Sequence, residues 1–205
     1  ISICDYLGGA LAKKALFNGW VGELSPDEAV LEAINWQNAG FKSLKIKVGS
    51  DTEQDIERVI AIREAVGSTM ILRIDANEQY SVKDGVYVSQ AISKCELQLF
   101  EQPVHRDNLD GLAEIRCKGN IPIMADEAIG DHQSLIKVLR ANCADFVKFG
   151  ITQAGGLTAA SKMIASAEAA NVQVVIGHGF GLHVSTMAEI MLGLTSDNVL
   201  PGLES

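Results

Sequence analysis

Three acidic residues, Asp75, Glu101 and Asp126, end short apolar stretches at intervals of 26 and 25 residues. If each acid stands at the carboxyl end of a strand in one parallel sheet, the three converge, because neighbouring strands lie about 4.8 Å apart. Ionised carboxylates held so close repel one another unless a cation joins them. Oxygen donors favour a hard divalent ion, so the sequence predicts that these residues bind Mg²⁺. For any one acid, capping a helix or facing solvent is the alternative.

Lys45 and Lys47 stand two positions apart in the otherwise largely apolar stretch 42–48. Residues two apart in a strand point the same way. If that is into the mouth of a barrel, two ammonium groups and a metal ion lie together and lower the pKa of both lysines, which makes a usable base near neutral pH. Metal and base together could remove the proton α to a substrate carboxylate. Lysines facing solvent on an edge strand are the alternative.

Strand-like and helix-like stretches alternate along the chain with a period of roughly 25 residues, which would position these side chains. We expect strands at 15–21, 42–48, 70–75, 97–101, 122–126, 145–149, 172–177 and 199–204. We expect helices at 25–40, 56–67, 81–95, 109–117, 133–142, 157–170 and 184–194.

The strand at 172–177 is apolar on both faces, as a parallel strand covered by helices must be. The pattern predicts an α/β fold, a (β/α)8 TIM-type barrel over residues 15–205, preceded by a remnant at 1–14. An open doubly wound sheet would carry a glycine-rich phosphate loop after its first strand, and residues 19–23 (GWVGE) do not fit one.

Five segments resemble the mandelate racemase and muconate lactonizing enzyme branch of the enolase superfamily: GFKSLKIKVG (40–49), RIDANEQYS (73–81), FEQPV (100–104), MADEAIG (124–130) and AGGL (154–157). The resemblance implies that Asp75, Glu101 and Asp126 bind magnesium. It implies that Lys47 is the base and that Lys45 assists by contacting the substrate carboxylate. It also implies an N-terminal domain that closes over the barrel and selects the substrate. We expect this chain to lack that domain and the last barrel helix, so racemisation, epimerisation, cycloisomerisation and dehydration stay open.

The sixth expected strand departs from the family pattern, which resembles Asp-x-x-Asn-x-Lys before two glycines. Aligned on residues 155–156, the lysine position is Gly150 and Lys148 takes the asparagine position. Lys148 still points inward, either as a second acid/base or as a buried lysine paired to a carboxylate. His178 follows the seventh strand, where the racemase type has a catalytic histidine, and it is either the second acid/base or structural.

Three further polar residues lie near the predicted site. We expect Glu127 to support the metal ligands from behind and Asn77 to line the metal site. Glu204 would end the eighth strand, and the sequence assigns it no role.

The net charge of −9 argues against nucleic-acid and anionic-membrane partners, which are bound through clustered lysine and arginine. A small carboxylate substrate and a homo-oligomer are the expected partners. The four cysteines lack metal-ligand spacing, so we expect buried free thiols. No membrane-length apolar run or signal peptide is apparent, so the expected location is the cytoplasm.

Two other functions fit the same sequence. A metal-dependent aldolase acting on a 2-oxo acid would use a Schiff-base lysine or a phosphate site, which residues 177–181 could imitate. A non-catalytic barrel remnant is the second alternative, and Gly150 is the feature that suggests it.

Overall fold

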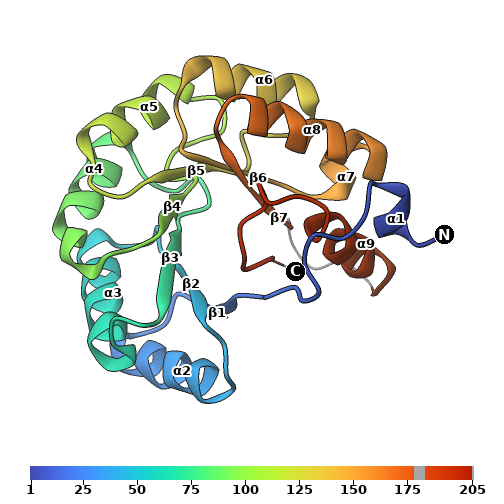
Figure 1. The fold of residues 1–205 in the computed structure, drawn as a ribbon. Coiled ribbons are helices and arrows are strands. Elements are labelled where there is room, and N and C mark those ends of the chain that lie inside the picture. The colour runs from blue at the N-terminus through green and yellow to red at the C-terminus, as the bar shows by residue number, and fades with distance from the viewer. Residues whose placement is uncertain (178–182, 205) are drawn as a thin grey trace.

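The computed structural model describes residues 1–177 and 183–204. Seven parallel strands form one curled sheet in sequential order, with helices packed around its outside (Figure 1). The strands are β1 (Gly19–Val21), β2 (Ser43–Lys47), β3 (Ile71–Asp75), β4 (Leu99–Glu101), β5 (Ile123–Ala125), β6 (Phe146–Phe149) and β7 (Gln173–Ile176). The fold is therefore α/β, with the alternation that the sequence predicts.

The described helices connect and cover the strands. They are α1 (Ile3–Tyr6), α2 (Pro26–Asn38), α3 (Thr52–Val66), α4 (Val82–Ala91), the 3₁₀ turn η1 (Ser93–Cys95), α5 (Leu109–Lys118), α6 (His132–Ala141), α7 (Ile151–Ala154), α8 (Leu157–Ala169) and α9 (His183–Gly193). Helix α2 begins where the sequence predicts, because the Ser25 backbone N–H donates to Glu28 Oε2 at 3.3 Å and Pro26 occupies the first turn. Among the described residues, no helix has the length and apolarity needed to cross a membrane.

Three elements before β7 differ from expectation. The first strand is shorter than 15–21 and keeps only Gly19–Val21. The helix expected at 81–95 ends at Ala91 and continues as the 3₁₀ turn η1, after which Glu96 takes a left-handed backbone with φ of 49°. Helix α7 is an extra short turn in the loop after β6.

Residues 198–204 lie between β7 and the chain before β1. Two isolated parallel bridges, Val174 with Val199 and Phe17 with Leu203, replace the strand expected at 199–204. A regular ladder is interrupted because Pro201 has no backbone N–H and Gly202 has φ of +94°. The segment nevertheless takes the place of an eighth strand, since it hydrogen-bonds to β7 on one side and to residues 16–18 on the other.

The strand register aligns the residues that matter for chemistry. Lys47 pairs with Asp75 across β2 and β3, and Asp75 pairs with Glu101 across β3 and β4. The three residues therefore form one row at the carboxyl ends of neighbouring strands, where barrel enzymes place their active sites. Below this row, the apolar side chains of Leu99, Met124 and Val175 form a small buried cluster. The larger apolar core lies between the sheet and the helices.

Candidate active site

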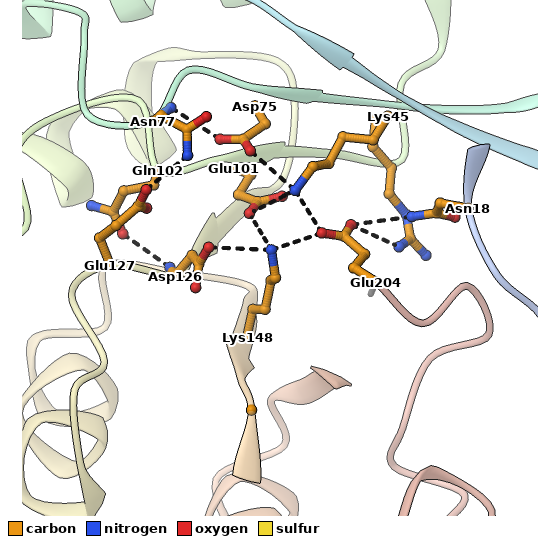
Figure 2. Close-up of polar contacts among 12 residues, drawn as sticks. Asn18, Lys45, Asp75, Asn77, Glu101, Gln102, Asp126, Glu127, Lys148 and Glu204 are labelled. Carbon is orange, nitrogen blue, oxygen red and sulfur yellow. Dashed lines mark hydrogen bonds and ion pairs between the residues drawn. The ribbon is translucent and has the colours of Figure 1, made fainter. Parts of the chain in front are cut away.

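The three predicted metal ligands are buried at the carboxyl ends of successive strands. Asp75 and Glu101 end β3 and β4, and Asp126 directly follows β5. Their exposed fractions are 0%, 0% and 3%. Figure 2 shows them turned toward one another, with the ammonium groups of two lysines between them. The prediction that these carboxylates converge is confirmed.

Lys45, on β2, is one of the two bridging cations. Its Nζ lies 3.0 Å from Asp75 Oδ2, 3.0 Å from Glu101 Oε2 and 2.6 Å from Glu204 Oε2. Burial alone would lower the pKa of Lys45, but the carboxylates of Glu101 and Glu204 outweigh it and raise the pKa above its ordinary value. In the absence of a bound metal ion the pKa of Lys45 is therefore raised rather than lowered, and Lys45 is a charged partner of the acids.

Lys148, on β6, is the second bridging cation and is 3% exposed. Its Nζ lies 2.7 Å from Glu101 Oε1, 3.2 Å from Asp126 Oδ2 and 2.7 Å from Glu204 Oε2. Burial opposes the charged form here too, yet the same carboxylates hold the pKa of Lys148 well above its usual range. The sequence left Lys148 either as a second acid/base or as a buried lysine paired to a carboxylate, and this geometry favours the second.

Lys47, the last residue of β2, differs from these two in its exposure. Its side chain is 29% exposed, against 11% for Lys45 and 4% for Lys148. Its Nζ lies 2.6 Å from Asp75 Oδ2 and also donates to Asn77 Oδ1. Lys47 is therefore the ammonium of the cluster that a substrate can reach most easily.

Glu204 joins both bridging lysines, a role that the sequence did not indicate. Its Oε2 accepts from Lys45 and Lys148, while its Oε1 accepts from Asn18 Nδ2 at 3.1 Å and lies 3.6 Å from Arg73 Nη1 (Figure 2). Burial opposes ionisation of this carboxyl, but Lys148, Lys45 and Arg73 lower its pKa below the ordinary value. Its position in the sequence could have indicated this role, because an acid that follows the last apolar stretch falls at the same edge of the sheet as the other three acids.

Asn77 links the exposed lysine to the acid behind the cluster. Its Nδ2 donates to Glu127 Oε1 at 2.8 Å, and its backbone N–H donates to Asp75 Oδ1 at 2.9 Å. Both residues thus lie where the sequence expected them, beside the predicted ligands. Burial, together with the charge of Asp126, raises the pKa of Glu127.

Gln102 fixes the backbone that carries the third acid. Its Oε1 accepts from the backbone N–H groups of Asp126, at 2.9 Å, and Ala128, at 3.2 Å. The side chain is fully buried, and its Nε2 donates to Val104 O at 2.8 Å. The motif FEQPV thus supplies an acid and the amide that positions the next acid along the sheet.

The donor set fits a hard divalent cation in its chemistry. Asp75, Glu101 and Asp126 offer carboxylate oxygens only, and the buried Glu127 Oε2 has no hydrogen-bond partner among the described residues. The ammonium groups of Lys45 and Lys148 nevertheless lie between these carboxylates. Among residues 1–177 and 183–204, no three acids, histidines or cysteines are arranged so that they could hold a metal ion. The mutual repulsion of the acids is therefore relieved here by Lys45 and Lys148.

His178 lies outside the described residues. The strand before it, β7, ends at Ile176. Gly150 is the N-cap residue of the short helix α7, directly after β6. The expectation for His178 therefore stays a prediction.

Comparison with known proteins places the chain among enzymes. Residues 28–204 match the family model described as enolase C-terminal domain-like. The L-Ala-D/L-Glu epimerase of Bacillus subtilis is 39% identical over 178 residues, which are 84% of this chain and 46% of the relative. The hydrophobic dipeptide epimerase of Enterococcus faecalis is 38% identical over 152 residues, 74% of this chain and 43% of that relative. Other relatives are named as a racemase, a cycloisomerase and a dehydratase.

The fold matches solved structures of the same kinds of protein. The crystal structure of the Enterococcus faecalis dipeptide epimerase complexed with Mg and the dipeptide L-Leu-L-Tyr aligns with a TM-score of 0.93 and 32% identity. The alignment covers 97% of this chain and 56% of that one. The chain spans about half the length of the curated relatives it matches.

Proposed function

The chain belongs to the enolase superfamily, in the enolase C-terminal domain-like family, and from this premise we propose that it removes the proton α to the carboxylate of a small substrate. In the proposed site Asp75, Glu101 and Asp126 hold a magnesium ion. The relatives include an epimerase, a racemase, a cycloisomerase and a dehydratase by name, and removal of this proton is a first step that all four reaction types could share.

The row formed by Lys47, Asp75 and Glu101 carries the proposal. It sets an accessible amine directly beside buried acids at the carboxyl edge of the sheet. Proton removal needs an amine that can reach carbon, and Lys45 and Lys148 are each bonded to three carboxylates. Lys47 is therefore the proposed base.

The residues around Lys47 would orient it. Asp75 and Asn77 hold its Nζ at the mouth of the site, and the neutral amine would take the proton from the α carbon. A bound magnesium ion would supply the positive charge that polarises the substrate carboxylate and favours loss of that proton. Lys45 and Lys148 would balance the remaining buried negative charge.

Return of the proton to the opposite face needs a second group. Lys148 is buried and occupied by Glu101, Asp126 and Glu204, which argues against it. We therefore propose His178 for this role.

We propose a dipeptide or an N-acylated amino acid as the substrate class. The support is the names of the relatives, which include two L-Ala-D/L-Glu epimerases, a hydrophobic dipeptide epimerase and an N-succinyl-L-Arg/Lys racemase. Both classes offer a carboxylate with an acidifiable α proton, as the proposed chemistry requires.

Exchange of the α proton with solvent tests the reaction. Protein expressed from its complete gene is incubated in deuterated water with Mg²⁺ and panels of dipeptides, N-succinyl amino acids and sugar acids. Proton NMR should show loss of the α-proton signal for one class, and EDTA should stop it. Exchange with none of them would contradict the proposal and favour a non-catalytic barrel, whereas borohydride trapping of a substrate on a lysine would favour the aldolase-type reaction.

A further inference from the structure

Lys148 occupies the space between two of the proposed metal ligands. Its Nζ lies 2.7 Å from Glu101 Oε1 and 3.2 Å from Asp126 Oδ2. These are the distances of direct ion pairs, with no room for a second cation between the ammonium and either oxygen. The side chain is 4% exposed, so water does not weaken the contacts.

The residue type at this position departs from the family pattern that the sequence resembles. In the family pattern an asparagine stands where Lys148 is, and an asparagine would bring no charge to the acids. Here β6 delivers a fixed positive charge into the cluster from the side opposite β2 (Figure 2). One unit of the charge that a divalent ion would supply is therefore already covalently present.

Glu204 is a further carboxylate that pairs with the Lys148 ammonium. Its Oε2 lies 2.7 Å from Lys148 Nζ, and its other oxygen is held by Asn18. Because Asn18 donates to Oε1 and Lys45 donates to Oε2, Glu204 is held by two contacts that do not involve Lys148. The ammonium can thus withdraw toward Glu204 without becoming an unpaired buried charge, which would be costly.

We propose that Lys148 is a built-in cation that competes with a divalent metal ion for Glu101 and Asp126, with Glu204 as the carboxylate that keeps the displaced ammonium. The inference rests on the proposed function for the identity of the metal ligands. It predicts that Lys148 weakens metal binding, in contrast to a residue that merely lines the site.

Metal binding to Lys148→Asn measures this competition directly. Titration calorimetry with MnCl₂ and MgCl₂ should show binding at least about tenfold tighter than in the wild type, which is about 1.4 kcal/mol. The reason is that the metal must first break the charged hydrogen bonds of Lys148 in the wild type but not in the variant. Lys148→Arg, which keeps the charge, should bind no more tightly than the wild type. Lys118→Asn, which removes an exposed lysine paired with Glu114, is the matched control and should leave the affinity unchanged.

Thermal unfolding gives a second readout that does not depend on activity. Saturating Mn²⁺ should raise the melting temperature of Lys148→Asn by more than that of the wild type, since tighter binding to the native state gives more stabilisation. If Lys148→Asn is unfolded without metal, recovery of its circular dichroism on addition of Mn²⁺ supports the inference. Failure of millimolar Mn²⁺ to restore the fold contradicts it.

The outcomes separate the inference from the proposed function. Equal or weaker metal affinity in Lys148→Asn, with clear binding to the wild type, overturns the competition and leaves the metal site standing. Absence of binding to every variant, at metal concentrations up to the millimolar range, overturns the metal site itself and the competition with it.

Discussion

Lys45 Nζ lies 2.6 Å from Glu204 Oε2, although the two residues are 159 positions apart in the chain. The contact joins β2 to the segment that completes the ring of strands, and Lys148 meets the same oxygen from β6. Arg73 strengthens the connection, because its guanidinium donates to the carbonyls of Pro201 and Gly202 at 2.8 and 2.9 Å. The charged cluster therefore also holds residues 199–204 against the sheet.

Glu204→Gln should destabilise the fold by about 2–4 kcal/mol, because it leaves two buried ammonium groups short of one carboxylate while keeping the shape. Urea unfolding followed by circular dichroism measures this. Glu114→Gln removes an exposed partner of Lys118 and should leave the midpoint unchanged. Equal midpoints for Glu204→Gln and the wild type would mean that the closing segment is held by its backbone bonds alone.

Lys47→Ala should abolish α-proton exchange and leave metal binding intact. A positioned general base typically contributes about 10²–10⁴-fold to the rate, so exchange should fall by at least two orders of magnitude. Deuterium incorporation measures the rate, and Mn²⁺ calorimetry measures binding. Lys42→Ala, an exposed lysine just before β2, is the control and should exchange normally. Wild-type exchange in Lys47→Ala would show that Lys47 is not the base.

The positions of the three acids could be predicted because each depends on local pattern. An apolar run sets where a strand ends, and a common period places Asp75, Glu101 and Asp126 at one edge of the sheet. The row of Lys47 beside Asp75 follows from the same reasoning, since parallel strands fix the register of neighbours.

The charge state of Lys45 could not be predicted in this way. The pKa of Lys45 depends on Glu204, which comes near only when residues 199–204 pack beside β7. Carboxylates from three segments that are distant in the sequence then raise this pKa by more than burial lowers it. The loss of regular pairing at residues 199–204 has a local cause that could have been read, because Pro201 cannot donate to a ladder. His178 lies outside the described residues, so its role rests on the sequence.

A second buried ion pair lies beside the end of β2, the strand that carries Lys47. Arg58 Nη1 lies 2.6 Å from Asp55 Oδ1 and also donates to Lys47 O at 3.0 Å, and both side chains are almost fully buried. Asp55 Oδ2 accepts from Tyr80 Oη at 2.6 Å and from the Gly49 backbone at 2.8 Å. The pair therefore fixes the turn that follows β2.

Arg58→Met should cost about 3–5 kcal/mol of unfolding free energy, since it leaves Asp55 as an uncompensated buried charge. Tyr80→Phe removes one hydrogen bond from the same carboxylate and should cost only about 1–2 kcal/mol. Chemical denaturation of both variants tests the difference. Similar costs for the two would show that Asp55 is held mainly by backbone donors.

The four cysteines should differ sharply in their reaction with a thiol reagent. All four are free thiols, and the expectation that they are buried holds for Cys95 and Cys143, whereas Cys117 is exposed and Cys4 is partly exposed. Burial raises the pKa of Cys143 to about 11 and also raises that of Cys95. Because the thiolate is the reactive form, both should be almost inert at pH 8 in the folded protein.

Ellman's reagent at pH 8 should therefore label Cys117 rapidly, and Cys117→Ser should remove the fast phase. Cys95 and Cys143 should react only when urea unfolds the protein, so their labelling rate should follow the unfolding transition. The physical reason is that reagent access and thiolate formation both require the α6–β6 loop and the η1 turn to open. Fast labelling of Cys143 without denaturant would show that this part of the fold opens locally, which would weaken the case for a rigidly held Lys148 on the adjoining strand.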